Sequence, residues 1–306
     1  MPLDAIKQFK NRVDPSKTRI VVLPDIVLAF GGKLSVKSGE EYLSCRNVFL
    51  SYVHSTNSRI ADVIACPEHY REWNQVELYP DLIAFEHDAC SLARAIVLFS
   101  ESAGALAELG AFCQDEVISE RLVVVISQTH YHGPSFIALG PIRHIEQMHS
   151  AGSICVVGSI VPTAFESEAF DVAKALQDKI DSGHKTNQFD STRTRDQLLL
   201  IADLVELFSA ITRAELQDIL EAMGVKLDSM RIKQMINLLQ LFKLVFPGHK
   251  TTQRYLVPPA TSKRKRYMDF VAKSGEPNFE RAKFKIQINE DDSTRNKIFR
   301  QAHGGK

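Results

Sequence analysis

Apolar residues in the first half of the chain alternate between short unbroken runs and segments with helical spacing. The runs TRIVVLP (18–24), RAIVLFS (94–100), RLVVVIS (121–127) and SICVVGSIV (153–161) predict strands buried on both faces. Helical spacing predicts helices at 40–55, 82–93, 103–115 and 164–183, while 58–66 holds a helix start or a short strand. Continuous strands alternating with helices favour a parallel sheet with both faces covered, so we predict an α/β, Rossmann-like domain over residues 1–184.

The pattern changes after a polar linker at 185–194. Three helices are expected at 195–210, 211–224 and 226–244. Thr212 and Glu215 stand at capping-box spacing, and Gly224 can end the second helix. Residues 245–259 predict a hairpin with its tip at Pro247-Gly248-His249-Lys250. Three helices followed by a hairpin indicate a winged helix-turn-helix domain at 195–260, which a basic C-terminal extension at 261–306 follows.

Composition limits the class of protein. The 306 residues are 44% hydrophobic, yet no uninterrupted apolar run reaches the roughly 18 residues of a membrane span. The N-terminal segment lacks the apolar core of a signal peptide, so we expect a cytoplasmic protein that does not associate with a membrane. The five cysteines form no CxxC pair, and no histidine or cysteine motif has metal-ligand spacing. Reduced, mostly buried thiols and no metal site are therefore expected.

Charge is divided unevenly between the two halves. Residues 1–184 contain 15 Lys and Arg against 23 Asp and Glu, whereas 185–306 contain 22 against 14. A basic half is typical of a nucleic-acid partner, because each Lys or Arg on a phosphate adds a salt-dependent attraction. The candidate contacts lie in the third helix, on the hairpin and at the start of the extension: Arg231, Lys233, Lys250, Arg254, Lys263, Arg264, Lys265 and Arg266. The alternative is a protein-interaction module with solvated charges.

Aromatic residues among the basic ones of the extension allow two interpretations. Tyr267, Phe270, Phe279 and Phe284 can stack on unpaired bases, or they can pack into the core.

The stretch SESAGALAELGAFC (100–113) places a carboxylate in an apolar helix. Ligands of parallel α/β sheets bind at the carboxyl ends of the strands, where this stretch begins. Gly104 and Glu108 are four residues apart and share one helical face, so Glu108 can point into a pocket above Gly104. A carboxylate there can stabilise an oxocarbenium-like transition state or attack the anomeric carbon of a sugar. Otherwise Glu108 caps a local N–H or pairs with an Arg from another element.

Neighbouring residues complete the predicted substrate site. Ser100, Glu101 and Ser102 lead into the helix N-terminus, which favours an anionic ligand. Gly31 and Gly32 form either a phosphate or ribose loop or a plain turn, and Asp25 is a candidate acceptor for a sugar hydroxyl. His130 and His132 follow another strand and act either as a general acid or as surface residues.

The motif SESAGALAELGAF resembles the nucleoside deoxyribosyltransferase-like family over roughly residues 15–185. The resemblance implies that Glu108 is a nucleophile on the sugar C1′ and that subunits self-associate. Ser102 stands where that family often has an acid, which favours hydrolysis of another N-glycoside over ordinary base transfer. With KTRIVVLPDIVLAFGGKLS (17–35), the two-part organisation is similar to effector proteins of bacterial retrons. That resemblance implies an anti-phage toxin whose partners are a reverse transcriptase and its single-stranded DNA–RNA.

We therefore expect an enzyme that cleaves the N-glycosidic bond of a nucleotide such as NAD, with no separate cofactor. The competing hypothesis is a non-catalytic nucleotide sensor or transcriptional regulator that binds DNA through the winged helix.

Overall fold

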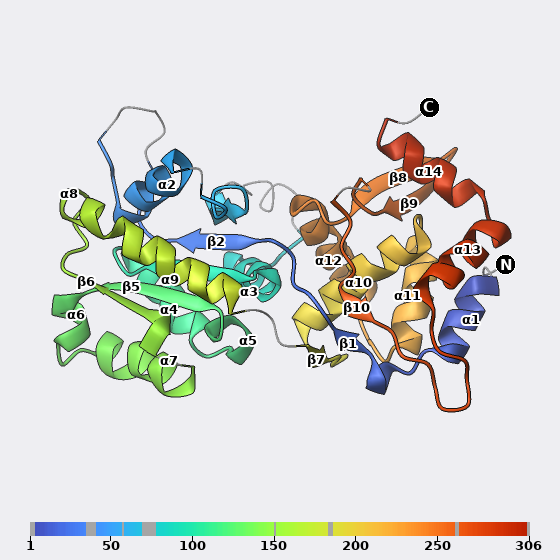
Figure 1. Cartoon of the computed structure of the whole chain (residues 1–306), viewed down its shortest axis with the longest axis horizontal. Coiled ribbons are helices and arrows are strands. Elements are labelled where there is room, and N and C mark those ends of the chain that lie inside the picture. Colours follow the sequence, from blue (N-terminus) through green and yellow to red (C-terminus); the bar gives the residue numbers. More distant parts are fainter. Residues whose placement is uncertain are drawn as a thin grey trace. The chain divides into compact units, whose positions relative to one another are not determined.

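A computed structural model describes residues 4–34, 41–56, 58–68, 78–149, 151–182, 186–260 and 263–304 (Figure 1). The chain forms two compact units. The sheet unit comprises residues 25–75 and 81–183, and the helical unit comprises residues 1–24, 76–80 and 184–306. The predicted first domain, 1–184, therefore differs from the sheet unit, because residues 1–24 and 76–80 belong to the helical unit.

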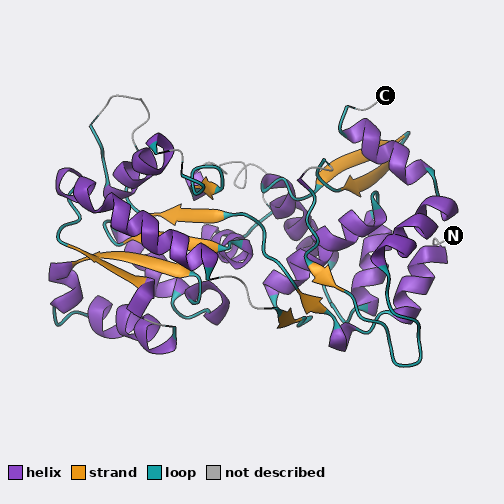
Figure 2. Ribbon diagram, viewed as in Figure 1, coloured by secondary structure: helices purple, strands orange, loops and turns teal. Residues whose placement is uncertain are grey.

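A five-stranded parallel sheet forms the centre of the sheet unit, in the order β3-β2-β4-β5-β6. Figure 2 shows these strands in orange among purple helices. All residues of the three central strands β2, β4 and β5 are buried, as the unbroken apolar runs predict for a sheet covered on both faces. The predicted parallel α/β architecture is confirmed. The strands are β2 (Val27–Phe30), β3 (Ile64–Ala65), β4 (Ala95–Phe99), β5 (Leu122–Ser127) and β6 (Ile154–Val157).

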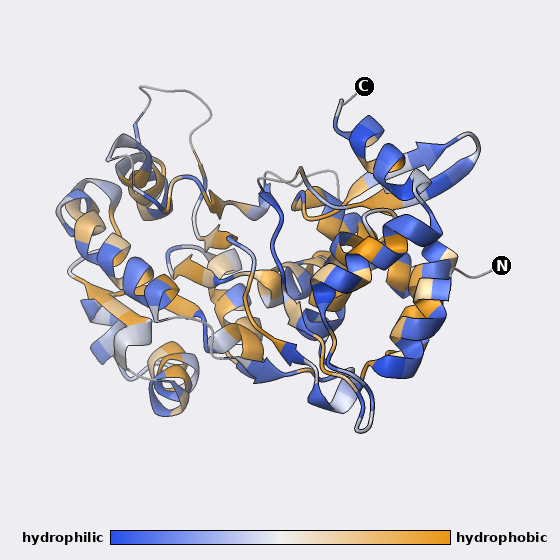
Figure 3. Cartoon of the chain, turned by 45° about the vertical axis from the view of Figure 1, so that its right-hand side comes forward, coloured by the Kyte–Doolittle hydropathy of each residue, from blue (hydrophilic) through white to orange (hydrophobic). Residues whose placement is uncertain are grey.

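Helices cover both faces of this sheet. Val48, Phe49 and Val172 from α2 and α9 pack with Val97 and other alternate strand residues in one cluster. On the opposite face, Phe112 of α4 packs edge-on against Phe30, with ring centroids 4.9 Å apart. Figure 3 shows the central strands of this sheet largely in orange, the hydrophobic end of the scale. The helices are α2 (Cys45–Ser55), α3 (Leu82–Leu92), α4 (Ala103–Phe112), α5 (Glu116–Ser119), α6 (Gln128–His132), α7 (Arg143–Met148), α8 (Pro162–Phe165) and α9 (Ala169–Asp181).

The prediction of a first strand at 18–24 is wrong for the parallel sheet. Only Arg19–Ile20 forms a strand, β1, and it pairs antiparallel with β7 (Asn187–Gln188) and β10 (Met268–Asp269) in the helical unit. The parallel sheet begins instead at Val27, after Pro24. Two apolar runs lie close together here, and periodicity alone does not tell which sheet each one joins.

Helix α10 is the core of the helical unit. Every residue from Arg195 to Phe208 is buried, and Phe9 of α1 packs against Phe208 with ring centroids 6.2 Å apart. Phe270, Phe279 and Phe284 also surround Phe9. Phe270 and Phe284 are buried and belong to the core, whereas Phe279 is half-buried. The helices are α1 (Asp4–Arg12), α10 (Thr194–Phe208), α11 (Arg213–Ala222), α12 (Ser229–Leu241), α13 (Arg281–Asp291) and α14 (Thr294–Ala302).

The capping box at Thr212 and Glu215 is present, and Gly224 follows α11 with φ +80°. A hairpin of β8 (Phe246–Lys250) and β9 (Gln253–Val257) follows α12. Its tip is at Thr251 and Thr252, so the predicted tip at 247–250 is wrong: Pro247 pairs with Leu256 within this two-stranded sheet, where every strand is an edge strand and tolerates proline. The order of three helices and a hairpin is as expected, and its classification as a winged helix stays a prediction.

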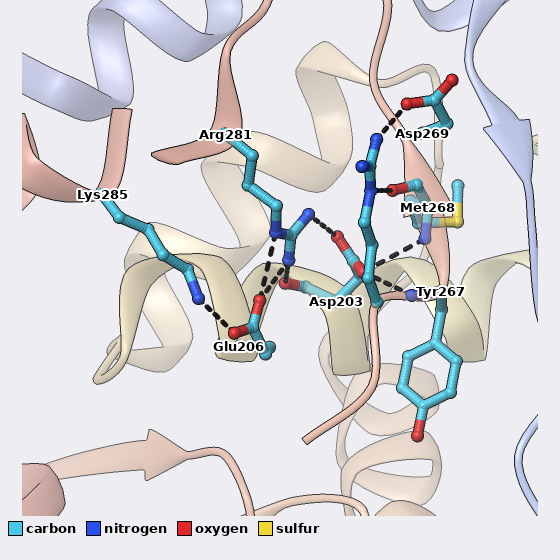
Figure 4. Close-up of polar contacts among 8 residues, drawn as sticks. Asp203, Glu206, Tyr267, Met268, Asp269, Arg281 and Lys285 are labelled. Carbon is cyan, nitrogen blue, oxygen red and sulfur yellow. Dashed lines mark hydrogen bonds and ion pairs between the residues drawn. The ribbon is translucent and has the colours of Figure 1, made fainter. Parts of the chain in front are cut away.

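A buried ionic network ties the C-terminal extension to α10 (Figure 4). Asp203 is fully buried and accepts hydrogen bonds from the backbone N–H groups of Tyr267 (2.7 Å) and Met268 (3.1 Å). Arg281 of α13 donates to Asp203 at 2.7 Å and also pairs with Glu206. The carboxylates of one helix therefore fix both a strand and a helix of the extension.

The five cysteines are free thiols, and four of them are buried. None of the helices in the described ranges combines the length and the apolar character that crossing a membrane requires.

Candidate active site

Glu108 lies in the wall of a cavity at the carboxyl end of strand β2. Helix α4 begins after Ser102, whose hydroxyl accepts a hydrogen bond from the N–H of Ala105 at 3.1 Å. Glu108 Oε2 is buried and has no hydrogen-bond partner among the described residues. The cavity has a volume of about 240 Å³ and is lined by Phe30, Gly31, Arg46, Pro67, Glu68, Leu82, Glu86 and Glu108. Glu108 therefore presents a carboxylate to a partly open cavity next to Gly31.

Two carboxyl groups of this cavity titrate near neutral pH. Burial raises the pKa of Glu108 to about 7, which Arg46 opposes and Glu68 reinforces. Burial also raises the pKa of Glu86 to about 8, and the charge of Glu108 adds to that increase. Near pH 7 the cavity therefore holds both a protonated and an ionised carboxyl group, the pairing that general acid–base and nucleophilic catalysis use.

Arg46 is the cation of the cavity, and its side chain is 2% exposed. Its Nη1 donates to the carbonyl of Ala29 at 3.1 Å, and its Nη2 donates to the carbonyl of Gly32. The same two nitrogens form a bidentate pair with Glu68, at 3.1 and 2.6 Å. These contacts fix the guanidinium, and no hydrogen bond joins it to Glu108 among the contacts of the described residues.

Glu101 supports the loop between β2 and α2. Its carboxylate accepts hydrogen bonds from the N–H groups of Gly32 (2.8 Å), Cys45 (2.6 Å) and Arg46 (3.1 Å). The N-terminus of α2 leaves backbone donors unsatisfied, and a carboxylate from a neighbouring strand end satisfies them. Glu101 was predicted to contact the substrate, but both of its carboxylate oxygens accept hydrogen bonds from the chain itself.

The two glycines after β2 are required by close packing around Glu101. Gly31 has φ +155°, and a Cβ there would lie 2.9 Å from Glu101 Oε1 and 3.0 Å from Phe99 Cβ. At Gly32 a Cβ would lie 2.7 Å from Ser44 Cβ. Gly104 is different, because a Cβ there would have only Ser102 Oγ within 4 Å, at 3.9 Å. Gly104 is exposed and does not line the cavity, so a side chain would fit there, whereas Gly31 and Gly32 serve the internal packing.

Four other predicted site residues lie apart from Glu108. Ser100 is buried and donates to the carbonyl of Val125 at 2.8 Å. Asp25 precedes β2 and pairs with Arg94, which precedes β4, at 3.0 Å. Parallel strands share their amino ends at one edge, so Asp25 lies at the edge opposite Glu108, and its expected place at the carboxyl edge is wrong. His130 and His132 are exposed on α6 and do not line the cavity.

Sequence reasoning missed Arg46, Glu68 and Glu86. Glu86 carried a signal comparable with that of Glu108, since it is a carboxylate inside an otherwise apolar stretch, LIAFEHDACSLA. Arg46 follows Ser44, the N-cap of α2, and is buried on a helix whose apolar spacing does not include it. Glu68 is far from both in sequence, and no local pattern distinguishes it.

The candidate nucleic-acid residues divide into two groups. A groove of about 770 Å³ lies between α11, α12 and the β8–β9 hairpin, and its basic lining residues are Arg213, Lys233 and Arg254. Arg231 lies on α12 and Lys250 ends β8, and neither residue lines this groove. The extension's cations are partly engaged: Arg264 stacks over Phe299 at 4.0 Å, and Arg266 pairs with Asp269. Lys263 is exposed and Lys265 is half-buried.

Comparison with known proteins supports the retron resemblance. The family described as STM3845 retron effector protein matches residues 42–247, which include Arg46, Glu68, Glu86 and Glu108 of the cavity, α10 to α12 and the start of the hairpin, but not Phe30 and Gly31. A search of curated proteins found no significant match. Because the match spans well over half of the chain, this protein belongs to the STM3845 retron effector protein family.

Proposed function

We propose that this retron effector acts against phage by cleaving the N-glycosidic bond of a nucleotide such as NAD. One observation carries the proposal: Glu108 Oε2 is buried, has no hydrogen-bond partner in the described part of the chain and faces a cavity of about 240 Å³. Leaving a buried carboxylate oxygen unsatisfied is costly for folding. A bound substrate that supplies a partner for this oxygen would remove that cost.

The chemistry follows from the charges of the cavity. Ionised Glu108 attacks the sugar C1′ or stabilises its oxocarbenium-like cation while the C1′–N bond breaks. The bonding electron pair leaves with the base. A cationic nicotinamide leaves as a neutral molecule and needs no proton, whereas another base can receive one from protonated Glu86. Water then adds its oxygen to C1′. In the covalent route the bond between C1′ and Glu108 breaks at this point and returns the carboxylate, and the proton of the water passes to solvent, or to Glu86 where Glu86 has protonated the base.

Ser102 and Gly104 are the proposed contacts for the sugar or a phosphate. Gly104 is exposed and has open space at its Cα, so a ligand can approach the backbone there. Ser102 is already the cap of α4, and its hydroxyl lies 3.5 Å from the carbonyl oxygen of Gly31. This hydroxyl therefore lies between the loop after β2 and the start of α4.

The enzyme hypothesis is tested by measuring free base released from NAD, nucleosides and nucleotides. The assay uses the full chain, alone and with the retron reverse transcriptase and its DNA–RNA, because an effector held inactive requires its partners for control. Glu108→Gln is expected to reduce release by on the order of a thousandfold. Glu166→Gln, an exposed carboxylate outside the cavity, is the matched control and should retain activity. Equal product from wild type and Glu108→Gln would leave a non-catalytic nucleotide sensor as the explanation.

We further propose that the helical unit binds the retron DNA–RNA and the reverse transcriptase, with self-association of the effector. Support comes from Arg213, Lys233 and Arg254, which line one groove beside the hairpin. Phosphates bound there would release counterions, so affinity for single-stranded DNA should fall steeply with salt.

A double variant tests this interface. Lys233→Gln with Arg254→Gln should lower the slope of log affinity against log salt by about 1.4, the value for two lost contacts with single strands. Arg266→Gln is the control, since Arg266 pairs with Asp269. An unchanged slope in the double variant would remove the groove as the phosphate-binding surface.

A further inference from the structure

The Arg46–Glu68 pair in the Glu108 cavity is unequal in its exposure. The side chain of Arg46 is 2% exposed, whereas that of Glu68 is 44% exposed. The cation is fixed from within by the carbonyl oxygens of Ala29 and Gly32. The carboxylate therefore reaches a buried, preorganised cation from the protein surface.

The remaining donors of Arg46 form a two-pronged site for an anion. Nη1 and Nη2 both point to Glu68, one to each carboxylate oxygen. Phosphate and carboxylate accept this guanidinium fork in the same bidentate way. Arg46 Nε is also buried and without a hydrogen-bond partner in the described part of the chain. A phosphate that replaced Glu68 would thus find two aligned donors.

One other candidate anion site in the sheet unit is already filled. The N-terminus of α2 is occupied by the Glu101 carboxylate, which accepts from Cys45 and Arg46. The N-terminus of α4, where Ser102 and Gly104 are proposed contacts, does not line the cavity. Arg46 is the buried cation that lines the same cavity as Glu108, so an anion bound to it would lie in the cavity where the C1′ chemistry is proposed.

We propose that Glu68 is an internal stand-in for a substrate phosphate, and that the cavity takes phosphorylated nucleosides in preference to free nucleosides. This inference rests on the proposed function for the place of the sugar beside Glu108. Phosphate displaces the Glu68 carboxylate from Arg46, so the buried cation stays paired throughout. A free nucleoside has no anionic group that could replace that carboxylate, so Arg46 adds nothing to its binding affinity.

The test compares AMP with adenosine, which differ only in the phosphate. Binding to the full chain is measured by calorimetry in the Glu108→Gln background, so that no turnover occurs. AMP is expected to bind about tenfold more tightly than adenosine. Glu68→Gln should tighten AMP by a further factor of about ten, because a neutral amide competes less for Arg46, and should leave adenosine unchanged. Glu166→Gln removes one exposed carboxylate elsewhere and should change neither.

Thermal unfolding supplies a second readout of the same site. Glu68→Gln should lower the melting temperature, because Arg46 loses its charged partner, and AMP or ribose 5-phosphate should restore it. Equal binding of AMP and adenosine, an equal effect of Glu68→Gln on both, or no binding of AMP and ribose 5-phosphate to Glu68→Gln would each overturn the inference.

The two proposals fail in different ways. If phosphate is preferred in a way that depends on Glu68 but no nucleotide releases its base, the anion site is supported and the proposed enzymatic activity is refuted. Base release from adenosine as fast as from AMP would keep the enzyme and remove the phosphate site.

Discussion

The carboxylate of Glu108 opposes the ionisation of Glu86 in the wall of one cavity, and it raises the pKa of Glu86 beyond the effect of burial. Two acids with pKa values of about 7 and about 8 stand beside one buried cation, Arg46. The protonation of this cavity therefore changes within the neutral pH range, and both catalysis and stability should depend on pH there.

Base release should increase as pH rises through about 7. Glu108 must be ionised to attack or stabilise C1′, and its pKa is about 7. Below that pH the rate should fall about tenfold for each pH unit. Initial rates between pH 5.5 and 8.5 measure this profile. A rate that is independent of pH, or that falls as pH rises through 7, would contradict a role for ionised Glu108.

Glu86→Gln should make the protein more stable at pH 8 and flatten the pH dependence of stability. The folded-state pKa of Glu86 is about 8, above the value of 4.5 for an ordinary Glu. Between these values the folded state retains a proton that the unfolded state has lost, so the free energy of unfolding falls as pH rises. Without this carboxyl group, the free energy of unfolding should fall less with rising pH, by on the order of a few kcal/mol.

Urea unfolding of wild type and Glu86→Gln at pH 5, 6.5 and 8 measures this effect. Glu166→Gln serves as the control, because Glu166 is exposed and lies outside the cavity. The prediction fails when wild type and Glu86→Gln lose stability equally between pH 5 and 8.

Alanine at the two kinds of glycine should have opposite effects. Gly31→Ala introduces a Cβ that would lie 2.9 Å from Glu101 Oε1, at φ +155°, and should destabilise the protein by about 1–3 kcal/mol. Gly104→Ala has open space in a helix and should be neutral or stabilise by up to about 1 kcal/mol. Thermal unfolding compares them. Substrate affinity that stays unchanged in Gly104→Ala would show that no ligand approaches the backbone there.

Asp203 should contribute far more to stability than Asp269, although each pairs with an arginine. Asp203→Ala leaves the partly buried Arg281 without one partner and two buried backbone N–H groups without an acceptor, which should cost about 3–5 kcal/mol. Asp269→Ala breaks a half-exposed pair with Arg266 and should cost under about 1 kcal/mol. Chemical denaturation measures both values. Similar losses in the two variants would refute the role of Asp203 as the anchor of the C-terminal extension.

The sequence by itself determined the local elements and the kind of sheet. Unbroken apolar runs at 95–99 and 122–127 are typical of strands buried on both faces, and their alternation with helices favours a parallel sheet covered by helices. The capping box at Thr212 and the place of Glu108 on an apolar helix were likewise readable, because they depend on spacing within one element. The family resemblance added a chemistry that spacing alone does not contain.

Tertiary structure decided which elements meet. Arg46, Glu68 and Glu86 come from separate segments and join Glu108 in one cavity, while Glu101 turns to the N-terminus of α2. Asp25 lies at the opposite strand edge, and β1 joins a sheet with a strand from the C-terminal extension. Side-chain periodicity specifies only the face that a residue occupies on its own helix or strand. Which faces converge depends on packing between distant segments, and burial in that packing sets the pKa values of the cavity.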